Sequence, residues 1–145
     1  MRPMNDNVFF DTNILVFAYS YTELEKQRLA RQLIAESNSF ISTQVLQELA
    51  NTLTRKFKFS YPDAAKAIKE SRENNNLHIN TESTLLQACT IAKRYRFSFY
   101  DSVIISAALE SDCTVLYTED MNHGQVIESK LKIANPFLNY LPRAS

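Results

Sequence analysis

Glycine and cysteine are scarce in this sequence, and each shortage excludes a class of site. Gly124 is the only glycine, so the glycine-rich loops that hold dinucleotides or nucleoside triphosphates are absent. Cys89 and Cys113 are the only cysteines and form no C-x-x-C pair, which leaves a disulfide framework or cysteine zinc site unsupported. We expect both to be small core residues. His78 and His123 lack an H-E-x-x-H context, so a zinc-peptidase site is also unsupported.

Net charge and long apolar runs are missing as well. Lys plus Arg and Asp plus Glu number 16 each, so the chain has no general electrostatic attraction to nucleic acid. The start, MRPMNDNVFF, lacks the basic flank and apolar core of a secretory signal, and no run approaches the ~20 residues of a membrane-spanning helix. We therefore expect a cytoplasmic protein outside the membrane. The hydrophobic share of 45% is typical of a packed globular chain.

Short apolar runs alternate with segments of helical periodicity along the chain. The apolar runs predict strands at residues 8–10, 40–41, 77–79, 114–117 and 130–133. The periodic segments predict helices over residues 22–36, 43–57, 62–74 and 85–94, and another after residue 101. The alternation predicts an α/β three-layer sandwich with a mostly parallel central sheet. Because repeats and linkers are absent, we expect one domain over residues 1–145.

Two acidic residues follow predicted strands directly. Asp11 ends the strand at 8–10, and Asp120 lies just past the strand at 114–117. Both would stand at the carboxyl edge of a parallel sheet, where open α/β folds bind ligands. Glu119 competes with Asp120, but successive strand side chains point to opposite faces, so we choose Asp120 to join Asp11. The plain alternative for Asp11 is a turn residue.

Glu48 and Asp101 lie on or beside predicted helices, and each has a structural alternative. Glu48 lacks a clear salt-bridge partner at helical spacing and is also consistent with a solvent-facing residue. Asp101 follows Ser98 in an S-x-x-D spacing, which is typical of a capping box at a helix start. Taken singly, neither residue decides the matter.

Taken together, these segments resemble the PIN-domain family, in particular the VapC-type toxin ribonucleases of bacterial toxin–antitoxin pairs. The resemblance spans nearly the whole chain and rests on V-F-F-D-T-N-I-L at 8–15, Q-E-L at 47–49, Y-D-S-V-I-I-S-A-A at 100–108 and L-Y-T-E-D at 116–120. It implies a PIN-like fold. The catalytic acids of the family map onto Asp11, Glu48, Asp101 and Asp120, and Asn13 and Thr118 match supporting positions. One departure is Ser111-Asp112-Cys113, where the family commonly has a glycine.

Four converging carboxylates repel one another unless a cation neutralises them, and a hard ion such as Mg²⁺ or Mn²⁺ prefers oxygen ligands. Such an ion activates water for hydrolysis of a phosphodiester bond. No serine, cysteine or threonine has a recognisable activating partner, so we expect direct attack by water. If these four acids bind metal, the Lys and Arg residues outnumber the remaining Asp and Glu residues, and the rest of the protein has a net positive charge. The stretches 55–58 and 93–96 then offer phosphate contacts, although solvated helix ends explain them more simply.

The resemblance implies a metal-dependent endoribonuclease that cuts RNA, most simply the toxin of a toxin–antitoxin pair. It also implies an antitoxin protein that covers the acidic cleft and a homodimer formed through the helices. A non-catalytic PIN-like module that binds RNA or protein stays open, as does a PIN nuclease in RNA processing. Tyr19, Tyr21 and Tyr100 are candidates for stacking on bases, but packing in the core or at its rim is the simpler interpretation.

Overall fold

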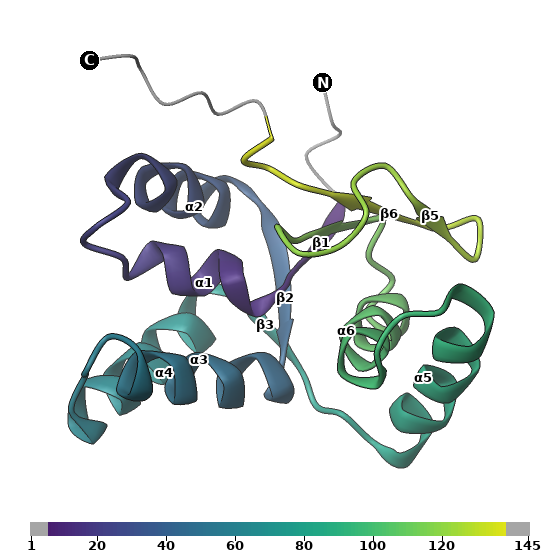
Figure 1. Ribbon diagram of the computed structural model, residues 1–145, viewed down its shortest axis with the longest axis horizontal. Helices are drawn as coiled ribbons and strands as arrows, with labels where there is room; N and C mark the ends of the chain where they lie inside the picture. The colour runs from purple at the N-terminus through teal and green to yellow at the C-terminus, as the bar shows by residue number, and fades with distance from the viewer. Residues whose placement is uncertain (1–5, 139–145) are drawn as a thin grey trace.

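A six-stranded sheet forms the centre of the computed structural model, which describes residues 6–138. The strand order is β3-β2-β1-β4-β6-β5, and every neighbouring pair is parallel except β5 with β6 (Figure 1). The strands are β1 (Asn7–Phe10), β2 (Asn38–Ser42), β3 (Asn76–His78), β4 (Val115–Tyr117), β5 (Val126–Ile127) and β6 (Leu131–Ala134). The predicted, mostly parallel sheet is confirmed. The two-residue strand β5 was not predicted.

Helices cover both faces of this sheet, so the predicted three-layer sandwich is confirmed. They are α1 (Thr12–Ala18), α2 (Leu24–Glu36), α3 (Thr43–Arg55), α4 (Tyr61–Asn74), α5 (Glu82–Tyr95) and α6 (Phe99–Glu110). The first four connect β1 to β2 and β2 to β3, whereas α5 and α6 lead from β3 back to the other side of β1. Because crossovers between parallel strands are right-handed, this reversal places the two groups on opposite faces (Figure 1).

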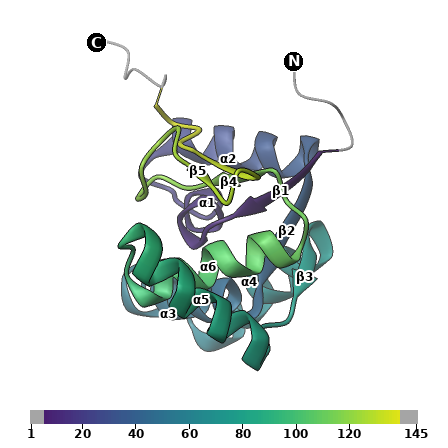
Figure 2. The same ribbon diagram turned by 90° about the vertical axis from the view of Figure 1, so that its right-hand side faces the viewer.

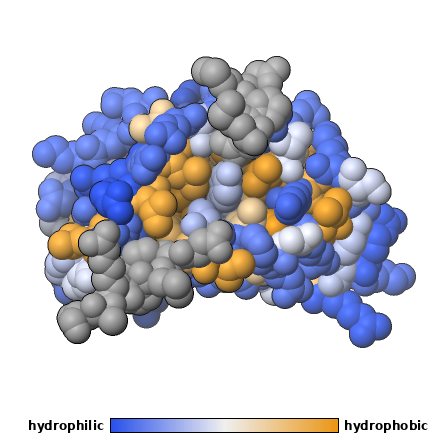
Figure 3. All heavy atoms as spheres, turned by 90° about the horizontal axis from the view of Figure 1, so that it is seen from above, coloured by the Kyte–Doolittle hydropathy of each residue, from blue (hydrophilic) through white to orange (hydrophobic). Residues whose placement is uncertain are grey.

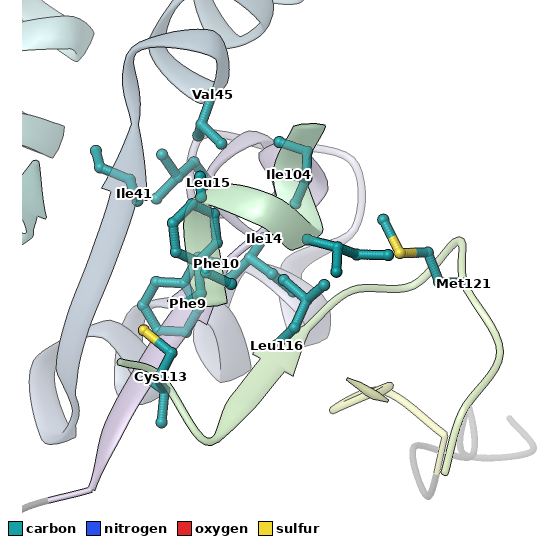
Figure 4. Close-up of a cluster of buried hydrophobic side chains, with 14 of the residues drawn as sticks. Phe9, Phe10, Ile14, Leu15, Ile41, Val45, Ile104, Cys113, Leu116 and Met121 are labelled. Carbon is teal, nitrogen blue, oxygen red and sulfur yellow. The ribbon is translucent and has the colours of Figure 1, made fainter. Parts of the chain in front are cut away.

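Strand β1 is buried on both of its faces. Phe9 and Phe10 point to opposite sides of the sheet, and neither is exposed to solvent. Figure 4 shows how side chains from neighbouring strands and from helices of both layers, such as Leu116, Ile14 and Ile104, meet this strand. Burial on both faces explains why V-F-F is a continuous apolar run rather than an alternating one.

The outer helix α5 shields α6 from solvent. Helix α5 is the outer of the two and α6 lies between it and the strands (Figure 1), so that α5 stands in front of α6 in Figure 2. All residues of α6 from Ser102 to Leu109 are buried, which a helix in the middle of a layered stack requires. Cys113 belongs to the core, and its burial raises the thiol pKa to about 12. The same prediction for Cys89 is wrong, because Cys89 lies on the exposed side of α5.

Two local features were not expected from the sequence: helix α1, and an aspartate at position 112 where the family commonly has a glycine. Helix α1 was not predicted, because Asp11, Thr12 and Asn13 favour turns and the following I-L-V-F has high strand propensity. The helix forms because Asp11 caps it and its residues pack into the core. Asp112 has a φ of 55°, the left-handed conformation that aspartate tolerates better than most residues. It therefore replaces the glycine that the resemblance leads one to expect.

Three asparagines form a ladder of side-chain hydrogen bonds at the amino edge of the sheet. Asn7, Asn38 and Asn76 are the first residues of β1, β2 and β3. Asn38 Nδ2 donates to Asn7 Oδ1 at 2.7 Å, and Asn76 Nδ2 donates to Asn38 Oδ1 at 3.3 Å. The ladder links the three strand starts with uncharged groups.

The surface of the molecule is uneven in polarity. Seen from above, hydrophobic residues gather in a band across the middle of the face, with hydrophilic residues at both ends (Figure 3). Within residues 6–138, no helix has both the length and the apolar character needed to cross a membrane.

Candidate functional site

The carboxyl ends of β1 and β4 mark the point where the chain connections leave the sheet in opposite directions. Open α/β sheets bind ligands in the crevice that forms at such a point. Asp11 follows β1, and its backbone N–H donates to the carbonyl oxygen of Tyr117, the last residue of β4, at 3.0 Å. This hydrogen bond holds Asp11 next to the segment that carries Thr118 and Asp120.

Asp11 is the most deeply buried of the predicted acids, with 7% of its surface exposed. Its Oδ1 accepts the backbone N–H of Thr12 at 2.7 Å, which caps α1, and its Oδ2 accepts the hydroxyl of Thr118 at 2.9 Å. Burial raises the pKa of Asp11 from 3.8 to about 6; these two hydrogen bonds oppose the rise, and the nearby Glu48 and Asp101 add to it. The surroundings of Asp11 therefore disfavour the ionised form of its carboxyl group.

Glu48 is held by donors from two helices. The hydroxyl of Thr12 on α1 donates to Oε1 at 2.5 Å, and Gln44 Nε2, one turn earlier on α3, donates to Oε2 at 3.2 Å. Gln44 Nε2 also donates to the carbonyl oxygen of Tyr100, beside Asp101, at 3.2 Å. Glu48 is half-buried, so the alternative of a freely solvated helix residue is wrong.

Asp101 fits both of the descriptions that the sequence left open. Its backbone N–H donates to Ser98 Oγ at 3.1 Å, which caps α6. Its carboxylate also faces the other acids. Burial raises the pKa of Asp101, a hydrogen bond between its side chain and Ser98 opposes this, and the charges of Asp120 and Glu48 raise it further. The capping role therefore does not remove Asp101 from the acidic cluster.

Asn13 and Thr118 hold the segment after β4. Asn13 Nδ2 donates to Asp120 Oδ2 at 3.0 Å, and Asn13 Oδ1 accepts the backbone N–H of Glu119 at 3.3 Å. Thr118 Oγ1 accepts the backbone N–H of Asp120 at 3.1 Å while its hydroxyl donates to Asp11. Both residues thus lie where the resemblance places supporting residues.

The argument that separated Asp120 from Glu119 was wrong. Strand β4 ends at Tyr117, so strand alternation does not apply, and both carboxylates line the same pocket. What distinguishes them is their partners: Glu119 Oε2 forms an ion pair with Lys26 Nζ at 2.6 Å, whereas Asp120 raises the pKa of Asp101. The choice of Asp120 as the fourth acid stays a prediction.

The structure brings all four predicted acids into one pocket of about 770 Å³. Within residues 6–138, no three His, Cys, Asp or Glu side chains lie close enough together to ligate a single ion. Mg²⁺ keeps several of its waters and takes only one or two carboxylates directly. The donor set, which is entirely carboxylate, therefore fits a hydrated divalent ion, and such an ion would balance the charge of Asp11, whose pKa is raised mainly by burial.

Sequence reasoning missed three polar residues of this site: Thr12, Gln44 and Lys26. Gln44 stands four residues before Glu48, a helical spacing that is itself a usable signal. Gln44 Oε1 accepts no hydrogen bond from the described part of the chain. No pattern marks Lys26 or the Thr12 hydroxyl, because their partners Glu119 and Glu48 are distant in sequence.

Comparisons with known proteins agree with this fold. The PIN domain profile matches residues 8–127, which is most of the chain. The chain belongs to the PIN-domain family. A comparison with curated protein sequences finds no match.

Solved structures with the same fold include toxins. VapC20 of Mycobacterium tuberculosis, described as a sarcin-ricin loop cleaving toxin, has a TM-score of 0.61 at 19% identity, over 78% of this chain and 89% of that one. A toxin–antitoxin complex from Klebsiella pneumoniae has a TM-score of 0.64 at 18% identity, and the match covers 89% of this chain and 97% of that one. VapBC2 from Rickettsia felis, bound to a DNA fragment from its promoter, has a TM-score of 0.59 at 16% identity, over 79% and 88%. At these identities the likeness establishes the fold.

Proposed function

We propose that this protein is a metal-dependent endoribonuclease that acts as the toxin of a toxin–antitoxin pair. The observation that carries the proposal is the convergence of Asp11, Glu48, Asp101 and Asp120 on one pocket at the carboxyl edge of the sheet. Membership of the PIN-domain family and the likeness to VapC toxins support RNA as the substrate. The cytoplasm stays the predicted location.

We assign different roles to the four acids of the pocket. Asp11 and Asp101 are the groups whose pKa is raised, and we assign them to the primary Mg²⁺ or Mn²⁺ ion. When bound, the ion would activate a water molecule and balance the charge that develops on the phosphate. Asp120 and Glu48 would hold its water ligands or a second ion, and either can accept a proton from the attacking water. Thr12 and Gln44 orient Glu48 for this task.

The alternative of a non-catalytic binding module explains less of the structure. A module that no longer cleaves has no need to keep Glu48 between two donors or to hold Asp120 through Asn13. We further propose an antitoxin protein that covers the pocket and places a basic side chain among the acids, and a homodimer formed through helices. The similar Klebsiella structure is a toxin–antitoxin complex, and the Rickettsia structure is VapBC2 bound to a DNA fragment from its promoter. A role in RNA processing would require no such partner.

RNA cleavage by purified protein, free of any co-purified inhibitor, tests the proposal. Single-stranded and structured RNAs are incubated with Mn²⁺, with Mg²⁺ or with chelator. Asp101→Asn is compared with Asp63→Asn, a matched control. Asp63 follows Ser60 on α4 just as Asp101 follows Ser98 on α6, and in both cases the serine oxygen accepts the aspartate's backbone N–H. Comparing these two variants separates an effect on the start of a helix from an effect on catalysis.

We expect cutting that requires the metal, that Asp63→Asn retains, and that Asp101→Asn lowers about a hundredfold or more. Cutting that survives both Asp101→Asn and chelator would come from a contaminant or another site. Absence of cutting by folded wild-type protein would refute the nuclease and favour the binding module.

A further inference from the structure

The pocket that holds the four acids extends beyond them and forms a groove with one acidic end. Its floor is α1, which contributes Asn13 and Phe17, and its walls are α3 on one side and the start of α2 with the segment after β4 on the other. Figure 1 shows α1 lying between α2 and α3. The far end of the groove is lined by Lys56 and Phe57, immediately after α3.

The two ends of the groove differ in chemistry. Lys56 follows Glu48 by eight residues, so at ~1.5 Å per helical residue it lies about 12 Å farther along α3. Aromatic rings lie at the end near Lys56: Phe57 lines the groove, and beside the groove Tyr21, 64% exposed, packs edge-on against Phe57 at 6.3 Å between centroids.

Lys56 is the lysine of the groove whose charge is available to a ligand. The other lysine that lines it, Lys26, forms an ion pair with Glu119 at 2.6 Å and lies 3.8 Å from Glu23. Within residues 6–138, Lys56 has no carboxylate within salt-bridge distance; its Nζ lies 5.6 Å from the centre of the Phe57 ring. A cation beside an exposed aromatic side chain, here Tyr21, is the combination with which proteins bind single-stranded nucleic acid.

We propose that this basic–aromatic end, formed by Lys56, Phe57 and Tyr21, binds the RNA strand on one side of the scissile bond. Lys56 contacts a neighbouring phosphate, and the exposed face of Tyr21, braced by Phe57, stacks on a base. The inference rests on the proposed function, because the acidic end must hold the phosphate that is cleaved. It makes the substrate a single strand, since a base that stacks on Tyr21 must be unpaired.

Binding to single-stranded RNA tests the proposal, with Lys56→Gln and Tyr21→Ser as the variants. Their matched controls are Lys66→Gln and Tyr61→Ser, which change exposed residues of α4 outside the groove. All proteins carry Asp101→Asn so that the RNA stays intact, and fluorescence anisotropy measures affinity for a labelled octanucleotide and a dinucleotide over a series of salt concentrations. Binding is measured without cleavage, so failure of the nuclease activity does not hide the result.

We expect Lys56→Gln to weaken octanucleotide binding about fivefold and to reduce the salt slope by about 0.7, as the loss of one single-strand phosphate contact requires. Tyr21→Ser should weaken it about tenfold with an unchanged salt slope. The dinucleotide, too short to span the groove, should bind all variants equally. If both groove variants bind the octanucleotide as their controls do, or if a double-stranded RNA shows the same losses, the proposal is wrong.

Discussion

The two edges of the central sheet differ in the charge of their side chains and in how those side chains are paired. At the amino edge, Asn7, Asn38 and Asn76 pair with one another through neutral amide hydrogen bonds. At the carboxyl edge, four carboxylates line one pocket, and burial raises the pKa of Asp11 to about 6. The asparagine ladder is complete within the chain itself. On the proposed function, a bound cation balances the charge of the acidic cluster.

On the proposed function, the amino edge serves stability and the carboxyl edge serves activity. Hydrogen bonds between neutral groups contribute modestly to stability and need no ligand. A buried carboxylate with like charges nearby lowers stability until a cation binds. We therefore expect substitutions at the two edges to have opposite effects on stability and on cleavage.

The largest expected effect comes from Asp11→Asn, which removes the buried charge. In chelator at pH 7 the variant should be more stable than wild type by about 2 to 3 kcal/mol, while cleavage is lost. Urea unfolding followed by circular dichroism gives the stability, and RNA cleavage in Mn²⁺ gives the activity. An unchanged or lower stability in chelator would show that the charge of Asp11 is already balanced within the chain.

The same substitution predicts a pH dependence with a definite sign. The pKa of Asp11 is higher in the folded protein, about 6, than the ordinary 3.8. Its penalty to folding is therefore fully present above pH 6, and stability is regained as pH falls from 6 towards 3.8. The stability difference between Asp11→Asn and wild type should shrink over this interval, and a constant difference from pH 7 to 4.5 would contradict the assignment.

A smaller effect is expected for Thr12→Val, which keeps the shape of the side chain but removes the hydroxyl that donates to Glu48. Loss of a partner that orients a metal-site carboxylate typically lowers activity or metal affinity ~10–100-fold, and we expect about tenfold here. Initial rates of RNA cleavage measure it. Thr12→Ser, which retains the donor, should cleave like wild type; if it is as impaired as Thr12→Val, the hydroxyl is not the cause.

The smallest effect is expected at the amino edge. Asn38→Ala removes both side-chain hydrogen bonds of the ladder's middle residue and should lower stability by about 1 kcal/mol. Urea unfolding measures this loss. RNA cleavage should not change, because the ladder lies at the opposite edge from the acids. A loss of cleavage in the folded variant would mean that the two edges are not independent.

Periodicity and strand ends predicted most of the fold because they report burial. Asp11 and the segment at 118–120 were correctly placed at one edge of the sheet because parallel strands end together. Helix α1 could not be predicted, since I-L-V-F favours a strand locally and only the cap and the core make it helical. Cys89 was misplaced because composition does not say which side of α5 faces solvent.

The four acids that line the pocket could be predicted from the sequence, but the residues that form hydrogen bonds with them could be predicted only in part. Asp11, Glu48, Asp101 and Asp120 were found by combining strand ends with the family resemblance, since each acid alone has an ordinary explanation. Their hydrogen-bond partners come from other elements of the fold. No local pattern connects Thr12 with Glu48, 36 residues away, because that contact exists only once α1 and α3 have packed together.

Calorimetric titration of Mn²⁺ into the metal-free protein at pH 7 tests the central claim most directly, because it measures whether the acidic cluster is a cation site without requiring the correct RNA. Wild type and Asn38→Ala should bind Mn²⁺ with the same affinity, and Asp11→Asn and Asp101→Asn should each bind at least about tenfold more weakly. No binding by wild type, or equal binding by all four proteins, would contradict it.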